Sequence, residues 1–95
     1  MSRTPANVPL LEYPCFYTFK AIGRVKADAP ADFADHVRSL VAGVLGYVSP
    51  DSCSVRESGK GNYHSVSVLV HLQSEAQRRA VYESFWKDER VVFYL

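Results

Sequence analysis

Cysteine is scarce in this sequence, which argues against a disulfide framework or a bound metal. Cys15 and Cys53 are the only cysteines, they lie far apart, and neither belongs to a Cys-x-x-Cys pair. The three histidines show no paired spacing either, whereas zinc sites usually present their ligands at short, regular intervals. We therefore expect two reduced thiols in half-buried strands, with no metal and no cofactor.

Long apolar runs and blocks of like charge are missing as well. No apolar run approaches the roughly 18 residues of a membrane-spanning helix, and residues 1–9 lack the apolar region of a secretory signal. The formal net charge is +1, without the clustered Lys and Arg that nucleic-acid-binding proteins normally carry. These absences predict a cytoplasmic protein that binds neither a membrane nor a nucleic acid.

The sequence does contain enough apolar material for one domain. Hydrophobic residues make up 47% of the 95 residues and aromatic residues 13%, so a core can form. A domain of this size buries only about 60–65% of its unfolded surface, which favours a homo-oligomer. Residues 1–12 are polar and carry Pro5 and Pro9, so we expect a flexible N-terminal arm followed by a single domain over residues 13–95.

The spacing of the apolar residues predicts four strands and two helices. The segments that alternate as strands do are residues 15–24, 52–57, 63–72 and 90–95. Helical patterns lie between the first and second of these segments and between the third and fourth. The order β-α-β-β-α-β predicts an α+β ferredoxin-like fold, with both helices on one face of a four-stranded antiparallel sheet.

The first helix has the clearest pattern. Its apolar residues recur at helical spacing at Phe33, Val37, Leu40, Val41 and Val44. Pro30 favours a start close by, and Gly46 is typical of the residue that follows a helix. At the start of the second helix, Ser74 and Gln77 match a capping box, and Arg78 is expected to be exposed.

The sheet face opposite the helices should be left partly bare. Alternation places eight residues on this open sheet face, namely Phe16, Lys20, Ile22, Ser65, Ser67, Leu69, Val92 and Tyr94. A half-apolar surface of this kind is usually covered by another subunit, a partner or a ligand. The interface residues that we predict there are Phe16, Lys20, Leu69 and Tyr94.

Two strings of residues make the chain recognisable. One reads Tyr-Pro-Cys-Phe-Tyr-Thr-Phe-Lys-Ala-Ile-Gly over residues 13–23, and the other reads Gly-Lys-Gly-Asn-Tyr-His-Ser over residues 59–65. Over roughly residues 10–95 the chain resembles the YbeD-like family of small bacterial proteins of unknown function. The resemblance implies an ACT-like ferredoxin fold, similar to the small regulatory domains that bind amino acids in biosynthetic enzymes. No established enzymatic activity attaches to that family, so the resemblance implies no catalytic residues.

The second string is also the candidate ligand site. The predicted ligand-binding residues are Lys60, Gly61, Asn62, His64 and Ser65. Successive N–H groups near Gly61 would form an anion nest, with Lys60 as a point charge. The alternative is a hairpin turn that uses glycine and asparagine for positive φ. His64 has the parity of the core-facing valines, and capping of local backbone groups and contact with a ligand both stay open for it.

Catalysis and RNA binding receive little support from the residues. Ser65 and Ser67 have no predicted acid–base partner and no oxyanion hole. Phe16, Tyr63 and Tyr94 offer aromatic rings for stacking, but the RNP signature is absent and the surface is not basic. We therefore expect a non-enzymatic regulatory module that senses a small anionic metabolite such as an amino acid. The alternative is a protein–protein interaction adaptor that uses the open sheet face.

Overall fold

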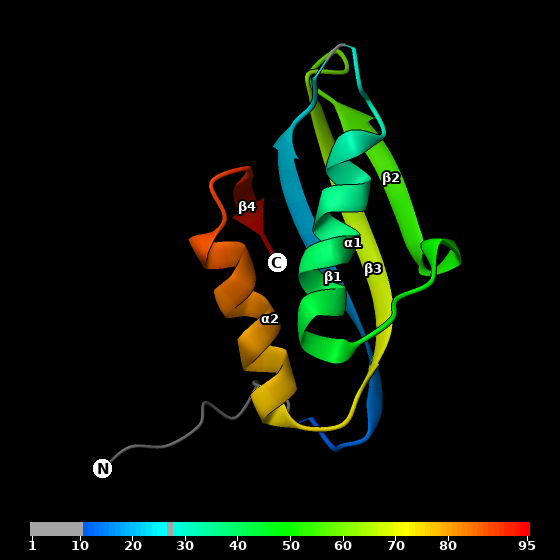
Figure 1. Ribbon diagram of the computed structural model, residues 1–95, viewed down its shortest axis with the longest axis vertical. Coiled ribbons are helices and arrows are strands. Elements are labelled where there is room, and N and C mark those ends of the chain that lie inside the picture. The colour runs from blue at the N-terminus through cyan, green and yellow to red at the C-terminus, as the bar shows by residue number, and fades with distance from the viewer. Residues whose placement is uncertain (1–10, 27) are drawn as a thin grey trace.

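The computed structural model describes residues 11–26 and 28–95 and has the order β-α-β-β-α-β (Figure 1). The elements are β1 (Cys15–Arg24), α1 (Asp32–Leu45), the 3-10 turn η1 (Pro50–Ser52), β2 (Cys53–Ser58), β3 (Tyr63–Leu72), α2 (Glu75–Lys87) and β4 (Val91–Tyr94). The strands form one antiparallel sheet in the order β2-β3-β1-β4, so the two longest strands are central. The predicted ferredoxin-like fold is confirmed. Most of the arm predicted for residues 1–12 lies outside the described residues.

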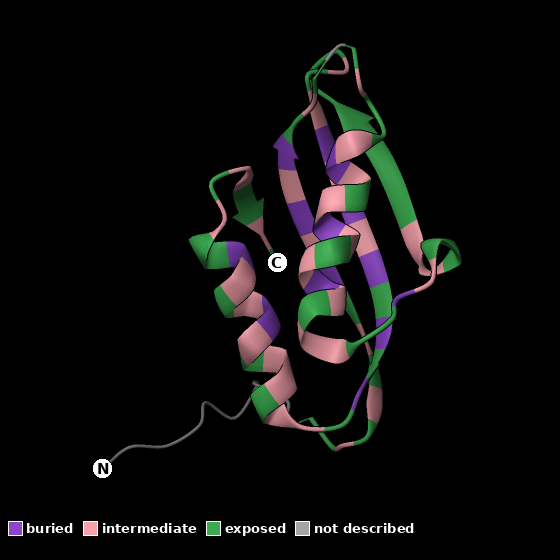
Figure 2. Cartoon of the chain, viewed as in Figure 1, coloured by how far each residue is buried: buried purple, intermediate pink, exposed green. Residues whose placement is uncertain are grey.

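Both helices cover the same face of the sheet, and the core lies between these two layers (Figures 1 and 2). The side chains fully shielded from solvent there are Phe19, Ala21, Phe33, Val37, Val41, Val66, Val68, Leu72, Val81 and Phe85. On β1 and β3 they alternate with exposed or half-buried residues, as the period of two in a strand requires. Burying one such large apolar side chain stabilises a fold by about 1.5–3 kcal/mol.

The helix α1 begins slightly later than the sequence indicates. Ala31 is its N-cap, has helical backbone angles and makes no side-chain cap hydrogen bond, so Pro30 lies just outside the helix. Asp32 and Asp35 occupy the first turn, where the helix dipole favours acidic side chains. At the other end Gly46, which we expected to follow the helix, is its C-cap, has a φ of +92° and donates its N–H to the carbonyl of Ala42.

The helix α2 begins with half of the predicted capping box. The Ser74 hydroxyl accepts a hydrogen bond from the backbone N–H of Gln77 at 3.2 Å. The Gln77 side chain does not return to Ser74. Its carbonyl oxygen instead accepts from the N–H of Gln73, one residue earlier, at 2.7 Å. Across residues 11–26 and 28–95, no helix is long and apolar enough to cross a membrane.

The last strand corrects one prediction, because Tyr94 does not lie on the open sheet face. Its ring packs against α2, with centroids 5.7 Å from Tyr82 and 5.9 Å from Phe85. The pairing of β4 with β1 shifts by one residue at Val92, and a shift of one residue reverses the side chains beyond it. Phe93 therefore points to the open sheet face in place of Tyr94.

Both cysteines are free and half-buried in strands, as predicted. Burial raises the pKa of the Cys53 thiol. A raised pKa lowers the thiolate fraction at neutral pH, and the thiolate is the reactive form of cysteine. Cys53 therefore has the environment of a packing residue.

Candidate functional site

The predicted ligand site falls in the tight turn between β2 and β3. Gly59, Lys60 and Gly61 all have positive φ, with values of 60°, 60° and 84°. The N–H of Gly61 donates to the carbonyl of Ser58, and the N–H of Asn62 donates to the carbonyl of Gly59, each at 3.1 Å. These two bonds use N–H groups that an anion nest would need. The backbone geometry is that of a closed chain reversal.

His64 lies on the helix-covered side of the sheet, away from the turn's exposed side chains. Only 6% of the residue is exposed, and it pairs with Gly23 on β1 and Glu57 on β2. Its Nε2 is 3.7 Å from a carboxylate oxygen of Glu57, and its buried Nδ1 has no hydrogen-bond partner among the described residues. Among the described residues, the His64 side chain forms no hydrogen bond to nearby backbone groups, so the capping role considered for it is not found.

Ser65 faces the opposite way from His64, onto the open sheet face. Consecutive strand residues point to opposite faces, so the two side chains cannot line one site. The side chains of Lys60 and Asn62 are exposed at the turn beyond both of them. The five predicted ligand residues therefore do not converge, and a ligand role for the turn remains a prediction.

What Ser65 does meet is a polar hollow on the open sheet face. Strand pairing aligns Lys20 with Ser67 and Ser67 with Ser54, which forms one row across three strands. In the next row along β3, Ser65 is aligned with Arg56. These five residues, together with Val55, line a hollow of about 260 Å³. Of this group, the sequence pattern placed Lys20, Ser65 and Ser67 on the open face but did not identify Ser54 and Arg56, because their alignment depends on the register of β2.

The charged side chains that β1, β2 and β3 turn to the open sheet face have one sign. The residues of β1, β2 and β3 that point there include Lys20, Arg24 and Arg56, and they include no Asp or Glu. Arg24 lies over the ring of Tyr63, with its guanidinium carbon 5.7 Å from the ring centroid. Within the described residues, neither Lys20 nor Arg56 forms an ion pair.

The same face also carries large apolar side chains. Phe16 is 74% exposed, Leu69 is 49% exposed, and Phe93 is 54% exposed. The Phe16 ring packs on that of His71 with a centroid distance of 4.9 Å. A second hollow, of about 330 Å³, begins at these rings and reaches Tyr47 in the segment between α1 and η1. Phe16, Lys20 and Leu69 thus lie on the open sheet face, and their role as an interface stays a prediction.

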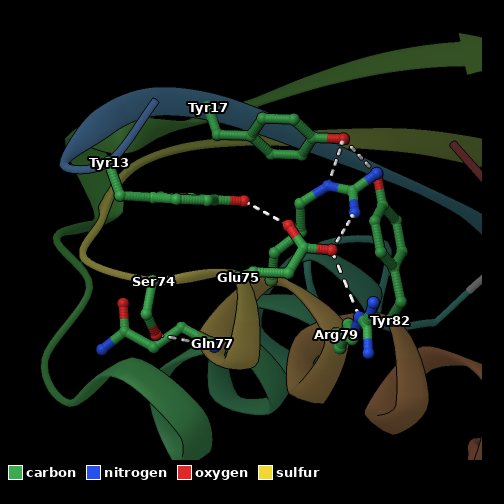
Figure 3. Close-up of polar contacts among 8 residues, drawn as sticks. Tyr13, Tyr17, Ser74, Glu75, Gln77, Arg79 and Tyr82 are labelled. Carbon is green, nitrogen blue, oxygen red and sulfur yellow. Dashed lines mark hydrogen bonds and ion pairs between the residues drawn. The ribbon is translucent and has the colours of Figure 1, made fainter. Parts of the chain in front are cut away.

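A cluster of tyrosines and charged residues joins β1 to α2 (Figure 3). The hydroxyls of Tyr17 and Tyr82 are 2.6 Å apart, and the Arg78 guanidinium lies 5.5 Å and 5.3 Å from the centroids of their rings. Arg78 also pairs with Glu75 at 2.9 Å, and Tyr13 donates a hydrogen bond to that carboxylate. Arg78, which we predicted to be exposed, is therefore half-buried. Its spacing of four residues from Tyr82 is the signal in the sequence that indicates a shared helix face.

The electrostatics of this cluster favour a structural role. Partial burial and the hydrogen bond to Glu75 raise the pKa of Tyr13 to about 12. Burial and the hydrogen bond with Tyr17 also raise the pKa of Tyr82. A raised pKa keeps a phenol neutral, whereas a tyrosine that acts as a base or nucleophile must lose its proton near neutral pH. The cluster therefore fastens β1 onto α2.

Metal ligands do not gather in the described part of the chain. Nowhere in residues 11–26 and 28–95 do three or more His, Cys, Asp or Glu side chains come together in a way that would hold an ion. The residues that do converge on a hollow are the cations and hydroxyls of the open sheet face. We take this face as the candidate functional site.

Comparison with known proteins agrees with this fold. The pattern of the family described as "protein of unknown function (DUF493)" matches residues 8–95. A UPF0250 protein from Idiomarina loihiensis is 38% identical over 86 residues, which cover 90% of this chain and 91% of the relative. A UPF0250 protein from Vibrio cholerae is 36% identical over 74 residues, which cover 78% of this chain and 74% of the relative. These names indicate no catalytic activity.

One solved structure is similar over the whole chain. The solution structure of protein HP0495 from H. pylori matches with a TM-score of 0.70, and the match covers 100% of this chain and 98% of that protein. The two sequences are 16% identical, so the likeness concerns the fold alone.

Proposed function

The chain belongs to the DUF493 family of proteins of unknown function, also called UPF0250 or YbeD-like, and from that premise we propose that it is a non-enzymatic adaptor that docks a protein partner on its open sheet face. One observation carries this proposal. The open sheet face combines exposed aromatic and aliphatic side chains with cations, and no acid of β1, β2 or β3 points to that face.

The apolar part of the face supports docking of a macromolecule. An antiparallel sheet that turns one face to solvent normally carries polar residues there. Here the large side chains of Phe16, Leu69 and Phe93 are each about half exposed or more. Phe16 and Leu69 line one hollow, whereas Phe93 lies beside Ile22, beyond the row of Lys20. Contiguous exposed apolar surface, such as that of Phe16 and Leu69, is typical of a protein interface when polar residues rim it. Single scattered apolar residues would not need this explanation.

The charged part indicates the chemistry of the partner. Lys20, Arg24 and Arg56 point to the open face, and no acid of β1, β2 or β3 points there with them, so a complementary surface is acidic. Face-to-face pairing of two copies would set these three cations against a face to which β1, β2 and β3 turn no acid, and this disfavours a symmetric dimer there. The occupant that fits best is therefore a different protein with acidic and apolar residues. The homo-oligomer expected from chain size stays a prediction for another surface.

Sensing of a small anionic metabolite, such as an amino acid, is the second candidate function. The hollow between Lys20 and Arg56 favours it, because about 260 Å³ lined by two cations and three hydroxyls suits a small acid. A thermal-shift screen with amino acids and short organic acids tests this function. A ligand at 100 times its dissociation constant would stabilise the fold by about 2.7 kcal/mol.

Site-specific photo-cross-linking in cells tests the adaptor function. The photoreactive amino acid p-benzoylphenylalanine replaces Leu69 on the open sheet face in one strain and Trp86 on α2 in another. Both positions carry large exposed apolar side chains, with exposed fractions of 49% and 73%, so they form a matched pair. We expect light to produce a discrete heavier adduct from position 69 and none from position 86.

The mass of the adduct and its position dependence decide the outcome. An adduct with a different protein whose cross-linked surface is acidic supports the proposal. Equal adducts from positions 69 and 86, or none from position 69, would overturn it. An adduct of twice the chain's mass would identify a second copy as the occupant and would also overturn it.

A further inference from the structure

We propose that Lys20, Arg56, Ser54, Ser65 and Ser67 form a binding site for one compact oxyanion, a carboxylate or a phosphate group. This inference deepens the proposed function and rests on it for the source of the anion, which there is an acidic side chain of the partner. The same chemistry also suits a free small anion. The experiment below distinguishes the two sources.

The geometry of this anion site is set by backbone pairing and not by a flexible loop. Its residues come from three adjacent strands, and strand pairing fixes their alignment in two neighbouring rows. Adjacent strands lie about 4.8 Å apart, and successive rows on one face lie about 7 Å apart. The side chains of both rows are therefore within reach of a single group a few ångströms across. A site on regular strands is held more firmly than a site on a loop.

The protein itself does not satisfy all the hydrogen-bond donors at this site. An ammonium has three N–H donors and a guanidinium five, and neither can accept a hydrogen bond. Lys20 is half-buried on the sheet, yet neither it nor Arg56 has an ion-pair partner in the part of the chain that the structure describes. Each serine hydroxyl adds one donor that can rotate toward a ligand.

The ligand that completes such a set is an acceptor with negative charge. Ionised carboxylates and phosphates accept hydrogen bonds only, and charge-assisted bonds are the strong ones. A metal ion is disfavoured by the two cations, and a neutral sugar would leave their charge unpaired. Because both cations remain accessible to water, we expect weak binding of a single anion, with a dissociation constant on the order of 1 mM.

An apolar hollow lies next to the anion site on the same face. On β3, Leu69 follows Ser67 on the same face, and on β1 Phe16 lies two rows from Lys20. The exposed rings and aliphatic groups of Phe16 and Leu69 therefore begin where the cationic rows end. A ligand that carries an apolar group next to its acid would contact both, so it should bind more tightly than the bare anion.

Titration of isotope-labelled protein, followed by amide NMR shifts, tests the site. The probes are sodium phosphate, sodium acetate and the capped peptide Ac-Glu-Leu-Glu-NH₂, each raised to about 20 mM at constant ionic strength so that screening does not change. We expect saturable shifts at the amides of Ser54, Ser65 and Ser67. The double variant Lys20→Gln/Arg56→Gln should bind at least tenfold more weakly.

A second double variant serves as the control. Arg79→Gln/Lys87→Gln removes the same net charge from exposed positions on α2, so it should bind all three probes as the wild type does. Folding of each variant is checked by the dispersion of its amide spectrum.

The pattern across the probes identifies the source of the anion. Saturation by phosphate or acetate that only Lys20→Gln/Arg56→Gln weakens supports the site for free anions. Saturation by the peptide alone supports an acidic side chain as the ligand. Shifts that stay linear, or that weaken equally in both double variants, would overturn the site. If the cross-linking experiment fails and the titration succeeds, a protein partner is excluded and the anion site is retained.

Discussion

Gly23 on β1 offers the sharpest test of how α1 packs on the sheet. A Cβ at this position would lie 2.4 Å from the backbone carbonyl oxygen of Arg90 and 2.4 Å from two ring carbons of Phe33. Phe33 is fully buried in the first turn of α1, so its ring has no free space into which it can move. The absence of a side chain at Gly23 is what lets the helix approach the strand.

Gly23→Ala should therefore destabilise the protein. Overpacking a core typically costs 1–3 kcal/mol, and the upper end of that range, about 3 kcal/mol, applies because one obstacle is backbone. The lower entropy of the unfolded alanine chain offsets about 0.4–1 kcal/mol of this cost. We expect a net loss of about 2 kcal/mol in the free energy of unfolding, measured by urea denaturation. The corresponding fall in Tm is on the order of 10 °C.

The same substitution at Gly43 provides the control. Gly43 lies on an exposed part of α1, and a Cβ there would meet nothing within 4 Å. Gly43→Ala should raise the free energy of unfolding by about 1 kcal/mol, because alanine is the better helix former. The two identical changes thus have opposite signs. A Gly23→Ala protein as stable as the wild type would refute the close packing of Phe33 on β1.

Two further predictions concern the turn and the tyrosine cluster. Gly61 has a φ of +84°, so Gly61→Val should lower the free energy of unfolding by about 1–2 kcal/mol. Lys60 has a φ of +60°, so Lys60→Gly should raise the free energy of unfolding. Equal effects of the two substitutions in urea denaturation would contradict the turn geometry. Partial burial and the bond to Glu75 raise the pKa of Tyr13 from 10.0 to about 12, so the unfolded chain loses this proton first. The Tm of the wild type should therefore fall as the pH rises from 10 to about 12, and the Tm of Tyr13→Phe should fall less steeply over the same range. The same slope of Tm against pH in both proteins would show that Tyr13 is not the group responsible.

The sequence predicted the fold well wherever its pattern was local. The bounds of β1 and β3 match their predicted ranges, because ten residues of alternation leave little ambiguity. The buried stripe of α1 was predicted for the same reason. The prediction was wrong at β4, where one bulged residue, Val92, exchanged the faces of Phe93 and Tyr94. A bulge depends on how two strands meet, which four residues of one strand do not reveal.

The candidate site was harder to predict, because neighbours in the sequence are not neighbours on a sheet. Grouping His64 with Ser65 treated the string as one surface, but adjacent strand residues face opposite sides. Parity alone was enough to exclude that pair. It was not enough to find Arg56, whose place beside Ser65 depends on the length of the turn that aligns β2 with β3.

Because the position of Arg56 depends on this alignment, the β2–β3 turn shapes the anion site although it does not line it. Three consecutive positive φ angles at residues 59–61 close the chain tightly, and the closure aligns Ser58 with Tyr63. Each later pair follows from that one, including the pair of Arg56 with Ser65. A slip of one residue would turn Arg56 to the helix-covered side and remove a cation from the open sheet face. The unusual Gly-Lys-Gly-Asn string is thus explained by register, since the geometry that it imposes places the cationic rows.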